Sequence, residues 1–530
     1  MNLSVTFNIK SLLKLHDWIQ KHIPWQKITI ILAVILSIST TVWAYLNDYI
    51  VSYGDAESHL NIAKRVIHSL TPGFAQLGGI WLPIPHLMMV PFVWSDTLWQ
   101  TGLAGSIVSG FCYVISSIFI YKMTRLVTKS HGAGFIAALV FMLNPNILYM
   151  QTTAMTELAL IMFFILSTHF FIRFIKNDNY LFSLIAAAFF GFCATLTRYD
   201  GWFLVIFQAL TILIMYIRKR ELWQKMEGKF LLYATPAFFG VFIWLLWDYL
   251  ILGDALYFTN SEFSAKTQQM NWLARGELPA YHNILQSFSY YFVTAMSNVG
   301  VIISAISLIG LTSFLFAKTD KKRFLIIFIL LVPFVFYVYT LYVGQSVIFI
   351  PHLTPVDFEW RLFNVRYGIM SVPIAAFFVG YLFHKSKLAG KWFLLALFIL
   401  QFALYFVGYS KVITWEDGVV GLSHAKRPNA EYWMKKNYDG GLVLLDDYAR
   451  TVSVIRTGIP MENNIYVGNK PYWEESLKAP EKYARWVVMQ KNDAVWNAVY
   501  DNEEVRGRLF KYFQKVYTSP EILIFRKPKN

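Results

Sequence analysis

Asp55, Glu57 and His59 lie close together just after the first long apolar segment, and each side chain can exchange a proton. A partly buried carboxylate beside a membrane has altered basicity, so Asp55 could accept a proton from a substrate hydroxyl. Aspartate is also a favoured N-cap residue, so Asp55 could instead cap the helix expected to follow. The two roles are compatible. Asp55 is the predicted catalytic residue, and Glu57 and His59 are candidate substrate-binding residues.

His86 ends the proline-punctuated stretch Gly78-Gly-Ile-Trp-Leu-Pro-Ile-Pro-His86. Its prolines and Trp81 favour a re-entrant or interfacial loop. His86 could bind substrate or exchange a proton near neutral pH. An isolated histidine among apolar residues can also be a hydrogen-bonded structural residue, so both roles stay open.

Five further charged residues stand at the ends of later apolar segments: Glu157, Arg198, Asp200, Arg361 and Arg366. Ionisable groups at membrane depth are costly and by default mark a functional site. Arg198 and Glu157 could instead form a pair that only holds helices together. A planar guanidinium suits the phosphate of a lipid, so Arg361 and Arg366 are predicted phosphate contacts. All five are candidate substrate-binding residues.

The elements that must position these residues are membrane-spanning helices. Of 530 residues, 56% are hydrophobic and 15% charged, against about 25% charged in ordinary soluble domains. Apolar runs near twenty residues match a hydrocarbon core of ~30 Å, and a helix satisfies its own backbone in lipid. The runs predict about eleven crossings, near residues 28–47, 102–121, 132–149, 154–172, 181–196, 201–217, 230–251, 296–316, 324–343, 367–384 and 392–409.

The basic residues are distributed unevenly between the two sides of the membrane. With a cytoplasmic N-terminus, the inside segments carry 21 lysines and arginines, whereas the short outside loops carry only Arg198, Arg361 and Arg366. Because positively charged loops stay in the cytoplasm, the net charge of +15 reflects topology rather than a nucleic-acid partner. We expect a multi-pass protein of the cell membrane with its C-terminal part on the non-cytoplasmic side.

The charge pattern also divides the chain into regions. We expect a cytoplasmic segment 1–27, a transmembrane domain 28–410 with outside loops 48–101 and 252–295, and a non-cytoplasmic α/β domain 411–530. The segment from residue 410 onward is polar, with 19 Lys/Arg and 15 Asp/Glu. Its pattern predicts a helix over 429–437 and strands over 441–446, 486–489 and 521–525. Alternating strands and helices favour an open sheet.

Taken together, these motifs resemble the GT-C class of polytopic membrane glycosyltransferases. The class includes protein O-mannosyltransferases, the lipid A aminoarabinose transferase and the catalytic subunit of oligosaccharyltransferase. The resemblance covers most of residues 28–410 and rests on the joint placement of Gly54-Asp-Ala-Glu-Ser-His59, Thr156-Glu157, Thr197-Arg-Tyr-Asp-Gly201, Gly253-Asp-Ala-Leu-Tyr-Phe258 and Val365-Arg-Tyr367.

The resemblance implies transfer of a hexose or pentose from a polyprenyl-phosphate donor to a glycan, lipid or protein acceptor outside the cytoplasm. Asp55 then corresponds to the essential carboxylate, as general base or as ligand of the acceptor or a divalent cation, and the arginines to donor-phosphate contacts. One departure is that Ala56 separates Asp55 from Glu57, which are adjacent acids in mannosyltransferases. This spacing turns the two side chains apart on a helix. Nothing demands a covalent glycosyl intermediate, so inversion is expected.

A transporter or flippase of a lipid-linked sugar is the alternative function. Its binding sites would lie near mid-membrane, with broken helices or repeated halves. Here the charged residues gather at the outer ends of the predicted spans, no internal repeat is visible, and a folded outside domain follows. The glycosyltransferase interpretation therefore ranks first.

Overall fold

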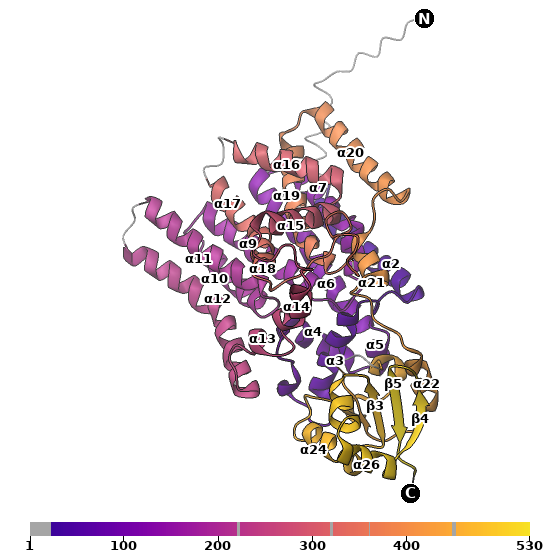
Figure 1. Ribbon diagram of the computed structural model, residues 1–530. Helices are drawn as coiled ribbons and strands as arrows, with labels where there is room; N and C mark the ends of the chain where they lie inside the picture. Colours follow the sequence, from indigo (N-terminus) through magenta and orange to yellow (C-terminus); the bar gives the residue numbers. More distant parts are fainter. Residues whose placement is uncertain (1–22, 220–222, 318–321, 360, 448–451, 530) are drawn as a thin grey trace, which may run out of the picture.

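The computed structural model describes residues 23–219, 223–317, 322–359, 361–447 and 452–529. The expected inside charges at positions 10, 14, 21, 220, 318 and 321 lie outside the described residues, as does most of the expected segment 1–27. Figure 1 shows an array of helices with a small sheet domain at one end.

The helices as far as the end of the last long apolar segment are α2 (Trp25–Leu46), α3 (Gly54–Ile67), η1 (Phe74–Gln76), α4 (Ile84–Val93), α5 (Asp96–Gln100), α6 (Leu103–Thr128), α7 (His131–Met142), α8 (Pro145–Met150), α9 (Glu157–Lys176), α10 (Leu181–Thr195), α11 (Asp200–Lys219), α12 (Trp223–Leu252), α13 (Tyr257–Asn260), α14 (Ala265–Ala274), α15 (Ile284–Val299), α16 (Val301–Leu315), α17 (Arg323–Leu330), α18 (Val332–Tyr342), η2 (Val365–Ser371), α19 (Val372–Lys385) and α20 (Leu388–Phe406). The C-terminal part contains α21 (Ile413–Val420), α22 (Asn429–Asn437), β1 (Val443–Leu444), α23 (Val454–Thr457), η3 (Met461–Asn463), β2 (Asn464–Ile465), α24 (Tyr472–Lys478), α25 (Pro480–Tyr483), β3 (Trp486–Gln490), η4 (Trp496–Tyr500), α26 (Glu503–Tyr512), β4 (Gln514–Thr518) and β5 (Ile522–Arg526).

Several helices are long and apolar enough to cross a membrane. Within the described residues there are seven, or up to nine if each of two bent helix pairs forms one span. Each of the eleven predicted segments contains helix, but α7 and α10 have only 12 and 15 residues. The protein is thus a helical multi-pass membrane protein, and eleven crossings stays a prediction.

Three of the predicted spans are broken. The span 324–343 bends by 43° between α17 and α18, and the other two break at residues whose chemistry favours a break. The segment 132–149 stops at Met142 and restarts at Pro145, where the Asn144 side chain caps α8 by accepting from the Ile147 N–H at 3.1 Å. The pair α15 and α16 bends by 109° at Gly300, whose φ is +92°. Proline lacks an N–H, and glycine readily adopts positive φ. As a result, residues 284–295, expected in an outside loop, are helical.

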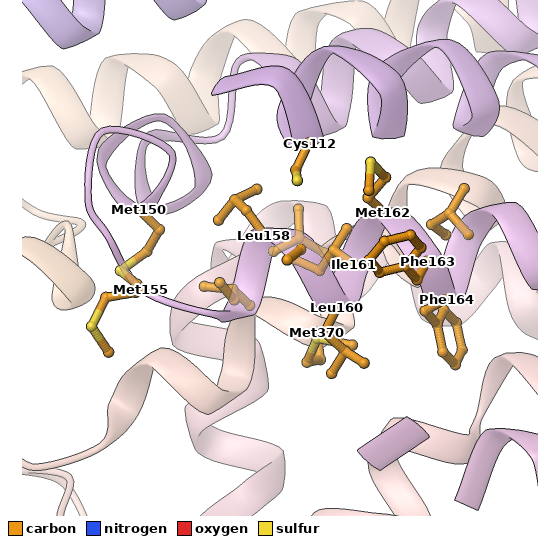
Figure 2. Packing of buried hydrophobic residues seen from close by; sticks show 14 of the residues in the cluster. Cys112, Met150, Met155, Leu158, Leu160, Ile161, Met162, Phe163, Phe164 and Met370 are labelled. Carbon is orange, nitrogen blue, oxygen red and sulfur yellow. The ribbon is translucent and has the colours of Figure 1, made fainter. Parts of the chain in front are cut away.

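Helix α9 lies at the centre of the helical core. Every residue from Leu158 to Leu166 is buried. Figure 2 shows Leu158 and Ile161 facing Cys112 of α6, with Leu160 near Met370 on another side. Burial on every side shows that other parts of the protein, rather than lipid, surround this stretch of α9. The first residue of α9 is therefore held inside the protein.

The C-terminal sheet has five strands in the order β2-β1-β3-β5-β4. The inner strands β1, β3 and β5 carry the apolar runs that predicted them, and helix α22 coincides with the predicted 429–437. Strands β2 and β4 were not predicted. β2 has only two residues, and β4 (QKVYT) is a largely exposed edge strand without an apolar run.

The sheet domain docks on the segment that follows the first span (Figure 1). Arg65 of α3 forms an ion pair with Asp447, and its guanidinium lies 3.6 Å from the centre of the Tyr466 ring. Asn469 Nδ2 donates to Ser69 Oγ at 3.0 Å. These contacts fix α3 between the helical array and the sheet.

Candidate active site

Asp55 is the second residue of α3, and the N-cap position belongs to Tyr53. Its Oδ2 accepts a hydrogen bond from Arg366 Nη2 at 2.8 Å. The side chain of Asp55 is 27% exposed, whereas that of Arg366 is 5% exposed. The capping alternative for Asp55 is therefore wrong, and the structure brings two predicted site residues into direct contact.

Glu157 joins Arg366 to a second arginine. It is the first residue of α9 and is fully buried. Its Oε1 accepts from Arg366 Nε at 3.2 Å and from Arg198 Nη1 at 3.0 Å. Two neighbouring guanidinium groups repel each other, and a carboxylate between them offsets this repulsion. Arg198 and Glu157 thus form the ion pair that the sequence suggested as a way of holding helices together. Through Arg366, this pair is also connected to Asp55.

Asp200 completes the arrangement at the other end. Its Oδ2 accepts from Arg198 Nε at 3.2 Å and from the Tyr337 hydroxyl at 3.2 Å. Tyr337 lies in the apolar helix α18, and no pattern in the sequence marked it as a site residue. The charged row, as we call it, runs in the order Asp200, Arg198, Glu157, Arg366 and Asp55.

Tyrosine rings hold the planes of the two guanidinium groups. The Tyr367 ring centre lies 5.3 Å from Arg198 Cζ and 5.2 Å from Arg366 Cζ. Tyr53 lies 5.4 Å from Arg366 Cζ, and Tyr337 stacks on Tyr367 with ring centres 5.1 Å apart. A planar guanidinium over an aromatic face gains cation–π energy and loses rotational freedom. These rings orient the arginines rather than supply reactive groups.

Two site residues that the sequence analysis missed come from the segment after the last long apolar helix. Arg366 Nη1 donates to Ser423 Oγ at 3.1 Å, and the Ser423 hydroxyl donates to Asp417 Oδ2 at 2.9 Å. The Ser423 carbonyl also accepts from the Gly54 N–H at 3.0 Å. Burial raises the pKa of Asp417 to about 6. The available signal was Trp415-Glu-Asp417-Gly directly after that helix, in a stretch expected to open the soluble domain.

His59 and His86 form a buried pair, with His59 Nδ1 2.9 Å from His86 Nε2. The Trp81 ring centre is 4.6 Å from that of His59. Burial lowers the pKa of His59 to about 4, so the ring is neutral at neutral pH. His59 follows Asp55 by four residues on α3, which places both on the same face of the helix. His86 is thus buried and hydrogen-bonded, as expected if it is a structural residue.

Glu57 and Arg361 lie apart from the charged row. Glu57 forms an ion pair with Arg427, whose Nη1 is 3.8 Å from Glu431. Arg361 is exposed, and its Nη2 donates to the Pro351 carbonyl at 2.6 Å. Asp55 and Glu57 therefore face different partners, in line with the spacing that Ala56 imposes.

The charged row suits proton acceptance and contact with an anion. Asp55 is its most exposed member, because the side chains of Glu157 and Asp200 are 0% and 3% exposed. In the described part of the chain, no group of three or more His, Cys, Asp or Glu residues is arranged to hold a metal ion. Arg366 contacts one oxygen of each neighbouring carboxylate, Asp55 Oδ2 and Glu157 Oε1.

Comparison with known proteins relates this geometry to a family. Residues 98–247 match the family model described as dolichyl-phosphate-mannose-protein mannosyltransferase. The fold is similar to ArnT from Cupriavidus metallidurans bound to undecaprenyl phosphate, with a TM-score of 0.56 and 11% identity, covering 93% of this chain and 97% of ArnT. It is also similar to the apo oligosaccharyltransferase of Archaeoglobus fulgidus, with a TM-score of 0.50 and 10% identity, covering 97% of this chain and 75% of that one.

No match to a curated protein sequence was found. The likenesses in fold extend along nearly the whole chain, through the membrane helices and the C-terminal sheet domain. The family-model match adds a sequence relationship over α6 to α12, which contains Glu157, Arg198 and Asp200. The protein is thus similar to polytopic membrane glycosyltransferases of the GT-C class, in sequence over residues 98–247 and in fold over nearly the whole chain.

Proposed function

We propose that the protein is a hexosyl- or pentosyltransferase that moves a sugar from a polyprenyl phosphate to an acceptor on the non-cytoplasmic side, with inversion at the sugar carbon. One observation carries the proposal. A row of alternating charges has three buried side chains, and its most exposed side chain is Asp55 at one end, 27% exposed against 19% for Arg198. A partly exposed carboxylate backed by two arginines suits a base that works beside an anionic leaving group.

In the proposed reaction, Asp55 takes the proton from the acceptor hydroxyl as the acceptor oxygen bonds to the sugar C1. The bond between C1 and the phosphate oxygen breaks, and its electron pair stays on the polyprenyl phosphate. No covalent sugar–enzyme intermediate is needed, because the phosphate is already a good leaving group. Attack from the opposite face inverts the configuration at C1.

Arg366 connects proton acceptance by Asp55 with stabilisation of the leaving phosphate. Its Nη2 donates to Asp55, and its Nε donates to Glu157. When Asp55 gains a proton, its attraction for Arg366 falls, so the guanidinium can turn one donor toward the phosphate that is gaining charge. Glu157 holds Arg198 and Arg366 side by side while this occurs.

The test is transfer by purified protein from radiolabelled polyprenyl-phosphate sugars to membrane-derived acceptors. Asp55→Asn removes the base and keeps the shape, so we expect turnover to fall by at least about 10²-fold while donor binding persists. The matched control is Asp48→Asn, since the Asp48 side chain is 72% exposed and, within the described residues, pairs with Arg456 at the surface. That variant should keep wild-type turnover.

Two outcomes would contradict the proposal. Full transfer by Asp55→Asn would eliminate Asp55 as the base and direct attention to Glu157 or Glu57. Movement of the labelled lipid across reconstituted vesicles without formation of a glycosylated product would favour the transporter alternative instead.

A further inference from the structure

Asp248 is a buried carboxylate outside the charged row. It lies near the end of α12 and is 0% exposed. Across the described residues, neither of its side-chain oxygens finds a hydrogen-bond donor. Trp244 lies one helical turn earlier, is 1% exposed, and its Nε1–H likewise meets no acceptor at hydrogen-bonding geometry. A buried polar group without a partner is costly, so two on one helix face call for an explanation.

Aromatic rings surround this pair. Trp244 packs with Tyr199 and Trp202 from the turn between α10 and α11. Tyr199 stacks on Phe258 of α13 with ring centres 4.9 Å apart, and Trp202 lies 5.6 Å from the same ring. Burial raises the pKa of Tyr199, its contact with the Trp244 side chain lowers this pKa, and the Asp248 charge raises it, so Tyr199 lies within reach of both side chains. We call Asp248, Trp244, Tyr199, Trp202 and Phe258 the aromatic site.

The first outside segment covers the aromatic site. The Tyr199 hydroxyl donates to the Ile80 carbonyl at 3.1 Å. Gly79 lies so close to Leu252 and Tyr257 that an added Cβ would be 2.4 Å and 2.6 Å from their side chains. The end of α12, the α10–α11 turn and the stretch before α4 therefore meet here. Three segments that converge on unpaired polar atoms are a common way to build a ligand site.

A single turn connects the aromatic site to the charged row. Arg198 and Asp200 place their side chains in the charged row, whereas Tyr199, between them, packs in the aromatic site. A sugar attached to a phosphate lies one bond from the phosphate oxygen. A group held by Tyr199 and its neighbours would thus be next to an anion held by Arg198.

The combination of groups indicates which ligand chemistry fits. Aromatic faces pack against the C–H face of a sugar ring, and a carboxylate with a nearby N–H donor can pair with hydroxyls, which both donate and accept. An ammonium ion would satisfy Asp248 but would leave the Trp244 N–H without an acceptor. Sugar hydroxyls satisfy both groups.

We propose that the aromatic site binds the sugar ring of the lipid-linked donor, with Asp248 and Trp244 contacting its hydroxyls. This inference rests on the proposed function, because it places the transferred sugar beside the charged row. It assigns sugar recognition to α12 and the α10–α11 turn, and leaves proton transfer to Asp55.

The experiment compares binding of radiolabelled bare undecaprenyl phosphate with binding of undecaprenyl phosphates that carry mannose, glucose, galactose or arabinose. The wild-type protein should prefer at least one sugar-bearing lipid. In Asp248→Leu and Asp248→Asn, that preference should fall by about 10- to 100-fold, the usual effect of losing hydrogen bonds to a charged group. Binding of the bare lipid should stay within about twofold. Glu227→Leu is the matched control, since Glu227 is exposed near the other end of α12.

A stability measurement separates recognition from a structural role. Leucine removes an unpaired buried carboxylate, so Asp248→Leu should raise the melting temperature while it lowers the sugar preference. A melting temperature that falls, with an unchanged sugar preference, would overturn the inference. A wild-type protein that binds every sugar-bearing lipid no better than the bare lipid would also overturn it.

Further measurements test whether the bound sugar belongs to the donor or to the acceptor, and whether the proposed transfer function itself holds. Binding of free radiolabelled methyl glycosides in the absence of lipid would mark an acceptor sugar and overturn the donor assignment. Failure of the proposed function appears differently, as a wild-type protein that binds sugar-bearing lipids selectively but forms no transfer product. Asp55→Asn should keep the sugar preference even though it loses turnover.

Discussion

Arg366 has a different partner for each part of its guanidinium. Nη2 contacts Asp55, Nε contacts Glu157, and Nη1 contacts Ser423. A lysine offers one point charge and could satisfy only part of this set. The residue thus acts by geometry as well as by charge, and substitutions at Arg366 can separate these two contributions.

Arg366→Ala should weaken binding of the polyprenyl-phosphate donor by about tenfold or more, and Arg366→Lys should restore it only in part. Removal of the guanidinium also takes one of two cationic partners from the buried Glu157, which keeps its hydrogen bond from Arg198. We therefore expect a lower melting temperature, measured by differential scanning fluorimetry on the detergent-purified protein. Arg361→Ala is the comparison, because that exposed arginine contacts a backbone carbonyl. An equal loss of donor binding in both variants would contradict a special role for Arg366.

Asp417 should make stability depend on pH. Its pKa is about 6 in the folded protein because of burial, against ~3.9 in an unfolded chain. The folded state therefore binds more protons between about pH 4 and 6, and the contribution of Asp417 to stability falls as the pH rises through this window. Asp417→Asn has no carboxyl group to titrate, so it lacks this pH-dependent contribution to stability, but it keeps a side-chain oxygen that can accept the hydrogen bond from Ser423. Its melting temperature relative to wild type should rise from pH 4 to 7, and a constant difference would show that Asp417 does not titrate there.

At the scale of single elements, the turn between α10 and α11 supplies groups to two sites. It contributes Arg198 and Asp200 to the charged row and Tyr199 to the aromatic site. Gly201 allows this close turn, because an added Cβ would lie 2.2 Å from the Ala194 carbonyl oxygen and 2.3 Å from its carbon. These neighbours are backbone atoms and cannot move aside as a side chain would.

Gly201→Ala should therefore destabilise the protein by about 1–3 kcal/mol and reduce transfer, because the turn must shift and carry both charged residues with it. Gly228→Ala is the matched control. It lies within α12 with nothing within 4 Å of the added Cβ, so alanine should stabilise the helix by about 0.5–1 kcal/mol. Equal melting temperatures for the two variants would show that the turn tolerates displacement.

Apolar length and charge bias predicted the helical elements well, and contacts between distant elements were harder to predict. Asp55 and Arg366 could be proposed together because both are charged residues at span ends, where a charge is costly without a function. Ser423 could not be proposed, since a serine in a polar stretch carries no such signal. Asp417 follows the last apolar helix, but it lies in a stretch expected to open the soluble domain. Tyr337 was equally hidden, because a tyrosine in an apolar helix usually packs in the core. The close approach of Gln401 in α20, whose Cδ lies 2.8 Å from where a Gly300 Cβ would be, also carries no sequence signal.

At the scale of the whole molecule, α3 connects the sheet domain to the charged row. Its first turn carries Asp55, and further along Glu57 and Arg65 form ion pairs with Arg427 and Asp447 of the C-terminal part. The sheet domain therefore lies on the same side of the helical array as Asp55 (Figure 1). The sheet domain and Asp55 must therefore lie on the same side of the membrane.

The stretch η2–α19 allows the orientation of the charged row in the membrane to be measured. It runs over Val365–Lys385, 21 residues, and carries Arg366 at its start. A helix of that length spans about 30 Å, the thickness of a hydrocarbon core. The exposed Lys387, just beyond its end, must then lie across the membrane from the charged row.

Single cysteines at exposed Lys436 of α22 and at exposed Lys387 test the predicted orientation. The charge bias predicts that a membrane-impermeant maleimide, added to intact cells, labels Lys436→Cys and misses Lys387→Cys. Both should react after permeabilisation, and the two native cysteines should give little background because both are buried. The opposite pattern would place the charged row in the cytoplasm, where the sugar donor would have to be presented on the inner leaflet. Labelling of both positions in intact cells would instead contradict the crossing by η2–α19, because no span would then separate Arg366 from Lys387.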